Sequence, residues 1–126
     1  MTFAKRVFFW AGFWGLVVII PGFFNERWIA QHQPPSITHP EFYYGFYGVA
    51  LVFQLLFLLV SRDPVRHRAI MPICMLEKLS FFVPSSILFA LGRASNLIAF
   101  FAALDLMWAV LFFIAYRKTA ATSATV

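Results

Sequence analysis

The chain has 126 residues, of which 62 % are hydrophobic and 12 % are charged, whereas soluble domains are about 45–50 % apolar and about 25 % charged. This composition excludes a water-soluble globular protein and predicts an integral membrane protein. The formal net charge is +5, but Lys and Arg form short clusters at the ends of apolar runs and no basic stripe, so nucleic acid is not an expected partner.

Four apolar runs divide the chain, and they cover residues 7–24, 42–60, 69–92 and 96–116. The shortest reaches ~27 Å at ~1.5 Å per residue, which matches the hydrocarbon thickness of a bilayer. The runs lack period-2 alternation, and lipid leaves no partner for open backbone groups, so all four are expected to be helices. The sequence therefore predicts one all-α domain over residues 1–126, a four-helix transmembrane bundle.

The first run follows Lys5 and Arg6 and so resembles a secretory signal. It is longer than a typical signal core, and residues 25–28 offer no small-residue cleavage site. We therefore expect it to remain as the first membrane helix.

The connections contain helix-breaking residues. Residues 25–41 include Pro34, Pro35 and Pro40, which makes this segment too proline-rich to continue a helix. After the second run, Asp63 is expected to cap the next element and Pro64 to occupy its first helical position. Residues 92–96 form a tight link, which predicts that the third and fourth helices are antiparallel neighbours.

Positive charge in the short connections predicts the orientation. Seven basic residues fall on one side and only Arg27 and Arg93 on the other. By the positive-inside rule both termini are expected in the cytoplasm, and the membrane is expected to be the plasma membrane, the inner membrane of a cell with two. On that side Arg62, Arg66 and Arg68 are expected to contact anionic lipid headgroups.

Three ionisable residues remain inside the apolar runs: Glu77, Lys78 and Asp105. Each costs roughly 2.5–3.5 kcal/mol on insertion scales, so such residues indicate a functional site by default. Counted from the basic end, Gln54, Glu77 and Asp105 lie at ~12–18 Å, slightly inside the midplane. The common depth predicts one polar cluster, because lipid-facing positions would leave each group without a partner.

Within this cluster Lys78 is expected to pair with Asp105 on the antiparallel neighbour, which leaves Glu77 over. Glu77 is then either protonated at neutral pH or hydrogen-bonded by Gln54 and an indole N–H of Trp14 or Trp108. The same residues serve two interpretations of equal weight, structural glue between helices and a site for a ligand or a proton. Pro84 in the third run could open a cavity above Glu77 and Lys78, but a bend that only serves packing is the favoured explanation.

Metal binding and conventional catalysis find little support. His32, His39, Glu26 and Glu41 lack a ligand spacing, so no metal is expected. The sequence has no nucleotide loop, Ser-His-Asp constellation or haem signature, and it indicates no particular cofactor.

A run of short motifs resembles small bacterial four-helix membrane proteins of the broad DoxX-like type. The motifs are His39-Pro40-Glu41-Phe42-Tyr43-Tyr44-Gly45, Arg62-Asp63-Pro64, Glu77-Lys78 and Leu91-Gly92-Arg93, and the likeness in layout extends over residues 39–116. The resemblance implies at most a quinone-linked accessory role. It transfers no catalytic motif to this chain. A fainter similarity, to sterol-isomerase bundles that use intramembrane acids, is opposed by the absence of histidine from the four runs.

Three functions are therefore open. The leading hypothesis is a non-enzymatic accessory or interaction subunit, in a larger membrane complex or a homo-oligomer, locked together by Gln54, Glu77, Lys78 and Asp105. The alternative is a binding site or enzyme for a hydrophobic small molecule such as a quinone or isoprenoid lipid. In it Glu77 is the proton donor or acceptor, Lys78 its electrostatic partner and Asp105 the residue that orients Lys78. A carrier is disfavoured because no inverted repeats are evident.

Overall fold

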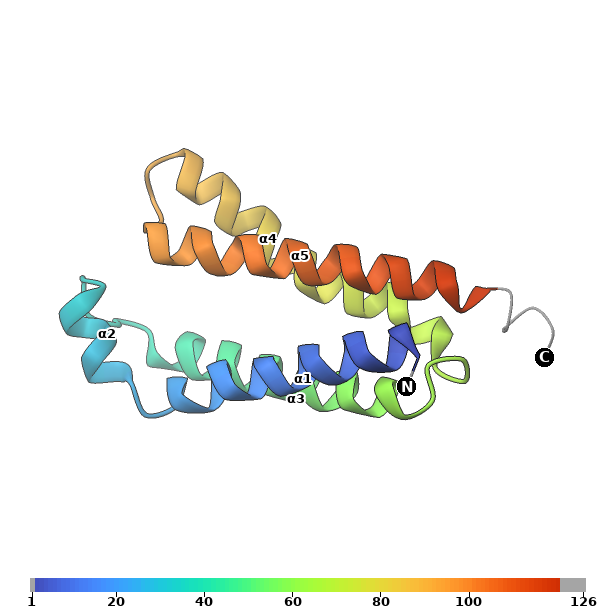
Figure 1. Cartoon of the computed structure of the whole chain (residues 1–126). Coiled ribbons are helices and arrows are strands. Elements are labelled where there is room, and N and C mark those ends of the chain that lie inside the picture. Colours follow the sequence, from blue (N-terminus) through green and yellow to red (C-terminus); the bar gives the residue numbers. More distant parts are fainter. Residues whose placement is uncertain (1, 121–126) are drawn as a thin grey trace.

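Residues 2–120 are described by a computed structural model, and this part of the chain is helical without any strand (Figure 1). Its elements, in chain order, are α1 (Phe3–Gly22), α2 (Glu26–His32), α3 (Pro40–Arg62), the short 3-10 helix η1 (Arg68–Ile70), α4 (Met71–Ala90) and α5 (Asn96–Lys118).

Four of these helices, α1, α3, α4 together with η1, and α5, are long and apolar enough to cross a membrane. This confirms the predicted all-α architecture with four helices of sufficient length and hydrophobicity to span a membrane. The helices α1, α3 and α5 extend beyond the apolar runs at the basic end, so that Lys5 and Arg6 lie within α1, Arg62 within α3, and Arg117 and Lys118 within α5. A helix continues into the polar interface because its backbone hydrogen bonds are internal and do not require an apolar side chain at every position.

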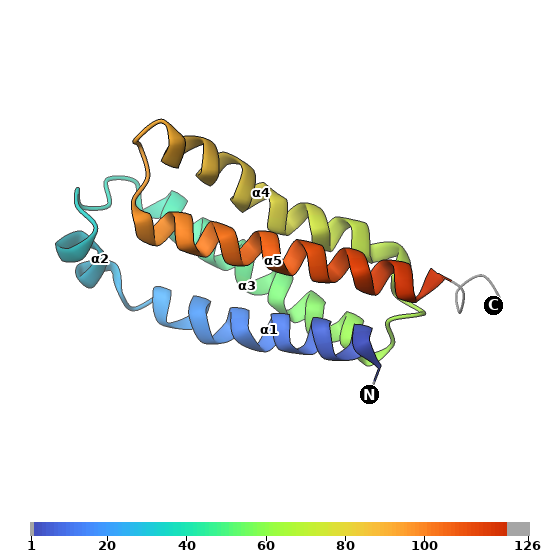
Figure 2. The same cartoon turned by 45° about the horizontal axis from the view of Figure 1, so that its top comes forward.

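The four long helices form two antiparallel pairs. Helix α1 lies along α3, and α4 lies along α5, as the short link between α4 and α5 predicted (Figures 1 and 2). That link includes Gly92, which has a φ of 73°, a left-handed conformation that glycine adopts without strain. Ser95 then caps α5, since its Oγ accepts a hydrogen bond from the amide of Ile98 at 3.3 Å.

The hydrophobic core joins the two pairs near the end where α1 begins and α5 ends. The rings of Phe8 on α1 and Phe112 on α5 are stacked with centroids 4.3 Å apart. Phe57 on α3 packs edge-on against both rings, and Met71 and Cys74 of α4 are fully buried in the same cluster. All four helices therefore contribute to the core at this end.

The backbones of α1 and α3 approach closely where α1 carries glycines. A Cβ at Gly12 would lie 2.9 Å from the backbone oxygen of Gln54, and a Cβ at Gly15 would collide with the Gln54 side chain. Small residues at such positions allow close packing of membrane helices. By contrast, a Cβ on Gly45 or Gly48 would meet nothing within 4 Å, so these two glycines do not serve the packing within the described chain.

Two connections differ from the predictions. Residues 26–32 form helix α2, because the prolines begin only at Pro34, and the hydroxyl of Tyr44 donates a 2.8 Å hydrogen bond to Glu26 Oε2 that anchors α2 to α3. The prediction that Pro64 begins the next helix is wrong. Asp63 Oδ1 accepts from the amide of Arg66 at 3.2 Å in a turn, and α4 begins only at Met71, with Pro72 in its first turn.

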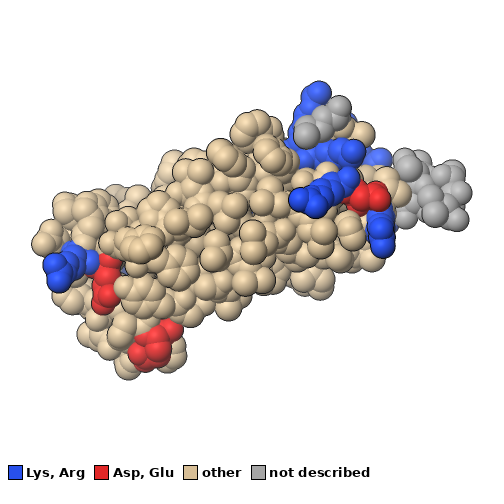
Figure 3. Space-filling model, turned by 90° about the horizontal axis from the view of Figure 1, so that it is seen from below, with Lys and Arg blue, Asp and Glu red and all other residues tan. Residues whose placement is uncertain are grey.

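Most of the basic side chains visible in Figure 3 gather at the end where α1 begins and α5 ends, and on this face a long stretch without charge separates them from the charged side chains at the other end. At this end α5 contacts α1, because Lys118 Nζ lies 4.7 Å from the centroid of the Phe3 ring. We call it the basic end below. The start of α1 and the end of α5 therefore both lie at the basic end.

Candidate functional site

The three charged residues of the predicted cluster meet between α4 and α5. Lys78 Nζ lies 3.7 Å from Asp105 Oδ1 and 3.8 Å from Glu77 Oε2. The side chains of Lys78, Glu77 and Asp105 are 7 %, 15 % and 22 % exposed. The predicted pairing of Lys78 with Asp105 is confirmed, and the short link between the two helices explains why both residues reach the same level.

Glu77 also contacts the ammonium of Lys78 that pairs with Asp105, so the surplus carboxylate that the sequence predicted is not set apart from the pair. Both N–O distances are longer than the roughly 2.7–2.9 Å of a charge-assisted hydrogen bond. The Glu77 Oε2 atom is buried and, among the described residues, has no hydrogen-bond partner. The three side chains thus form an ionic contact rather than a closed hydrogen-bond network.

The predicted hydrogen bonds to Glu77 from Gln54, Trp14 and Trp108 are not formed within the described part of the chain. Gln54 is 1 % exposed, and its Nε2 donates to the backbone oxygen of Ala50 at 2.9 Å, one turn earlier on α3. Trp14 is 42 % exposed on the outside of α1. The buried Trp108 Nε1 and Gln54 Oε1 have no partner in residues 2–120. Gln54 and Trp108 therefore place polar atoms in the interior, but neither side chain is hydrogen-bonded to Glu77.

Lys78 also faces an aromatic ring. Its Nζ lies 5.0 Å from the centroid of Phe57, within the distance at which a ring quadrupole attracts a cation. Cys74, one turn earlier on α4, is buried in the core. Lys78 is therefore held on the core side of Glu77, between the hydrophobic core and Asp105.

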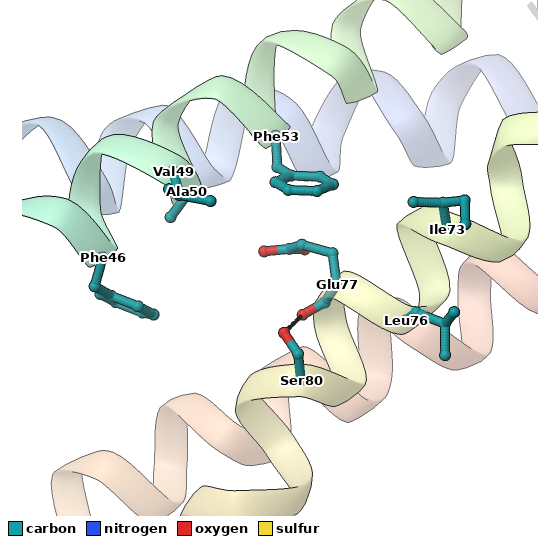
Figure 4. A pocket seen from close by; sticks show the side chains of 8 residues that line it. All are labelled: Phe46, Val49, Ala50, Phe53, Ile73, Leu76, Glu77 and Ser80. Carbon is teal, nitrogen blue, oxygen red and sulfur yellow. Dashed lines mark hydrogen bonds between the residues drawn. The ribbon is translucent and has the colours of Figure 1, made fainter.

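A pocket of about 340 Å³ lies on the opposite side of Glu77, between α3 and α4 (Figure 4). Helix α3 contributes Phe46, Val49, Ala50 and Phe53, and α4 contributes Ile73, Leu76, Glu77 and Ser80. The Glu77 carboxyl group extends into the space between Phe53 and Phe46 (Figure 4). The Ser80 hydroxyl donates a 2.5 Å hydrogen bond to the backbone oxygen of Glu77, so the carboxylate is the polar group that the pocket offers to a ligand.

The pocket opens on the outer surface of the bundle. Phe46 and Val49 on α3 and Ile73 and Leu76 on α4 are large apolar side chains that line it and are also exposed. Toward the other end α4 leads away from α3 (Figures 1 and 2), and Pro84, which cannot donate a backbone hydrogen bond to Ser80, lies in this part of α4. A molecule within the bilayer would reach Glu77 sideways, between α3 and α4.

The three arginines predicted to contact lipid headgroups lie near the end of α3 and in the following turn. Arg62 and Arg66 are exposed. Arg68 instead contacts α5: its Nε donates to the backbone oxygen of Tyr116 at 3.1 Å, and its guanidinium carbon lies 3.7 Å from the centroid of the Tyr116 ring. Arg68 therefore joins η1 to α5, which leaves Arg62 and Arg66 as the freer cations for a headgroup.

The side chains considered as metal ligands lie at the end of the bundle opposite the basic end. His39 Nδ1 and Glu41 Oε1 are 3.2 Å apart and exposed, while Glu26 is bonded to Tyr44 and His32 to the backbone oxygen of Trp28. In residues 2–120 no group of three or more His, Cys, Asp or Glu side chains is placed to hold a metal ion.

Comparisons with models of protein families, with curated proteins and with solved structures found no match to this chain. The resemblance to DoxX-like proteins therefore stays a prediction from its short motifs.

Proposed function

We propose that this protein is a small multi-pass membrane protein whose α3–α4 pocket binds a hydrophobic molecule from the bilayer, with Glu77 as the polar contact. The observation that carries this proposal is the pocket itself, apolar on nearly every wall and open toward lipid, with one carboxyl group directed into it. Binding sites for small molecules commonly combine apolar walls with a few placed polar groups. A quinol or an isoprenoid alcohol would present a hydroxyl donor to Glu77.

Lys78 and Asp105 support Glu77 in this proposal. The ammonium of Lys78 lies on the core side of the carboxylate and lowers the free energy of holding it inside the bundle. Asp105 in turn orients Lys78 from α5. These roles require binding alone and no chemical step, so we propose a non-enzymatic protein.

A second candidate is the accessory or interaction subunit, in which the cluster only holds helices together. The contact between Lys78 and Asp105 favours it, because the pair joins α4 to α5 in the middle of the bundle. The two candidates differ in what Glu77 does, since structural glue gives no reason for its carboxyl group to face a lipid-accessible pocket.

Native mass spectrometry of the gently purified protein tests the pocket. We expect a co-purifying small molecule with the wild-type protein and with Val52→Trp, whose side chain is exposed on α3 outside the pocket. Val49→Trp places an indole in the pocket wall and should remove that molecule. Equal retention in both variants would show that the molecule binds elsewhere, and the accessory role would then be favoured.

We further propose that the basic end faces the cytoplasm of a cell bounded by its plasma membrane, as the positive-inside rule indicates. In a Cys74→Ala background, Thr38→Cys should react with an impermeant maleimide on intact cells, and Ala69→Cys should react only after lysis. Both positions are exposed and lie at opposite ends of the bundle. The opposite labelling pattern would contradict this orientation and place the basic end outside the cell.

A further inference from the structure

The charges of the cluster do not balance. Glu77 and Asp105 supply two carboxylates and Lys78 supplies one ammonium. The other charged residues of the sequence lie near or beyond the ends of the four long helices. An uncompensated charge is costly in a medium of low dielectric constant, so a proton or a further cation must neutralise the cluster.

The place for that cation is the pocket and not the core. On the core side, Glu77 already faces Lys78, whose Nζ lies 3.8 Å from Glu77 Oε2. On the other side the carboxyl group extends between the rings of Phe53 and Phe46 (Figure 4). Aromatic faces attract organic cations, and the attraction is stronger where water is excluded.

The lining side chains offer little to an anion. The Ser80 hydroxyl is used by the backbone oxygen of Glu77, and the six other residues that line the pocket beside Ser80 and Glu77 are apolar. Lys78 is not among the lining residues. The walls therefore combine a carboxylate, aromatic rings and aliphatic side chains, a composition suited to a positive charge that carries hydrophobic substituents.

We propose that the α3–α4 pocket binds a lipophilic organic cation, an amine or quaternary ammonium that enters from the bilayer and supplies the charge that the cluster lacks. This inference rests on the proposed function, because it names the chemical class of the ligand for the same pocket. A cavity of about 340 Å³ accommodates the ammonium head and its nearest carbons, and the rest of a long chain remains among the lipids.

Two probes of the same shape test the charge. They are 4-octyl-N,N,N-trimethylanilinium and 1-octyl-4-tert-butylbenzene, in which a quaternary nitrogen is exchanged for carbon. The protein in nanodiscs carries 4-fluorophenylalanine at Phe53 or, in a second sample, at Phe46, and fluorine NMR follows each titration. We expect the ammonium probe to shift both resonances saturably. The neutral probe should shift them no more than the same probe does in the Val49→Trp variant.

The outcomes separate the two proposals. Saturable binding of both probes with similar affinity would overturn the cation inference and leave a pocket for neutral hydrophobic ligands. No saturable binding of either probe would overturn the cation inference, and if native mass spectrometry also found no ligand lost in Val49→Trp, the proposed function would fall with it.

Two matched variants test whether the Glu77 carboxylate is the group that attracts the cation. Glu77→Gln should weaken binding of the ammonium probe by about tenfold or more, since it removes the carboxylate in a low-dielectric site. Asp63→Asn also removes one carboxylate, but in the turn at the basic end, and should leave the affinity within about twofold. Helical circular dichroism confirms that each variant is folded, and equal weakening by both variants would refute a direct role of Glu77.

Protons should compete with the probe. The charged groups next to Glu77 are Lys78 on α4 and Asp105 on α5, while α3 presents Phe46, Val49, Ala50 and Phe53 to it. Because a proton on Glu77 removes the charge that attracts the cation, affinity in the wild-type protein should fall as the pH is lowered, and this fall should be reduced in Glu77→Gln. An affinity independent of pH between about 4 and 9, a range that extends about five units upward from ordinary carboxyl values, would contradict the competition.

Discussion

Replacement of Lys78 by methionine tests whether the charged cluster stabilises the bundle. The change keeps most of the side-chain length but leaves Glu77 and Asp105 without the ammonium that lies 3.8 and 3.7 Å from their oxygens. Removal of one partner from a buried ion pair costs ~3–5 kcal/mol in soluble proteins. Both carboxyl side chains are partly exposed, and each can take up a proton, so we expect the free energy of unfolding to fall by ~2–3 kcal/mol.

The measurement is reversible unfolding from mixed micelles with dodecyl sulfate, followed by circular dichroism. Leu76→Met, an exposed position on the same helix, serves as the control and should change stability by less than ~0.5 kcal/mol. In the double variant Lys78→Met with Asp105→Leu, the pair is removed together, and the loss should be ~1–2 kcal/mol smaller than the sum of the single losses. Strictly additive losses would show that Lys78 and Asp105 do not interact, and the cluster would lose its structural role.

Substitutions at four further positions probe the packing and capping by the same unfolding measurement. Gly12→Ala places a Cβ 2.9 Å from the α3 backbone and should lower the free energy of unfolding by ~1–3 kcal/mol. Gly48→Ala places a Cβ that meets nothing within 4 Å and should leave stability unchanged or raise it by up to ~1 kcal/mol. The reverse order of stabilities would contradict the close approach of α1 and α3. Ser95→Ala removes the cap of α5 and should cost ~1 kcal/mol, with Ser95→Asp close to wild type. Arg68→Lys loses the planar stack on Tyr116 and the hydrogen bond to its backbone oxygen and should cost ~0.5–1.5 kcal/mol; an unchanged stability would mean that η1 is not held to α5 by this side chain.

The sequence predicted the long helices well because hydrophobic length is a strong constraint. A span must be apolar over about 20 residues, and the breakers between the runs are clear. The ends are less predictable: Lys5 and Arg6 lie inside α1 although they precede the apolar run. Helix α2 has only seven residues, too few to be stable alone. Its contact with Tyr44 through Glu26 depends on tertiary structure, which a sequence pattern does not reveal.

The candidate site was predictable in depth but not in direction. Counting residues from the basic end brought Lys78 and Asp105 to one level, and the short link between their helices made them neighbours. Depth says nothing about which face of a helix a residue occupies. Trp14 is at a suitable level yet lies exposed on the outside of α1, and Gln54 bonds its own helix. The pocket beside Glu77 depends on how α3 and α4 diverge, a property of the whole bundle.

Glu77 lies where tight packing gives way to the pocket, and this position explains how one cluster can serve both stability and binding. On the core side, Phe8, Phe57 and Phe112 fill the space among α1, α3 and α5, and Lys78 closes that region. On the other side the exposed walls of the pocket begin. The pair formed by Lys78 and Asp105 joins α4 to α5, whereas Glu77 is the residue of the cluster that lines the pocket between α3 and α4. Substitutions at Asp105 should therefore change mainly the free energy of unfolding, and substitutions at Glu77 mainly the affinity for the ligand; a protein in which both effects always move together would have a cluster that serves structure alone.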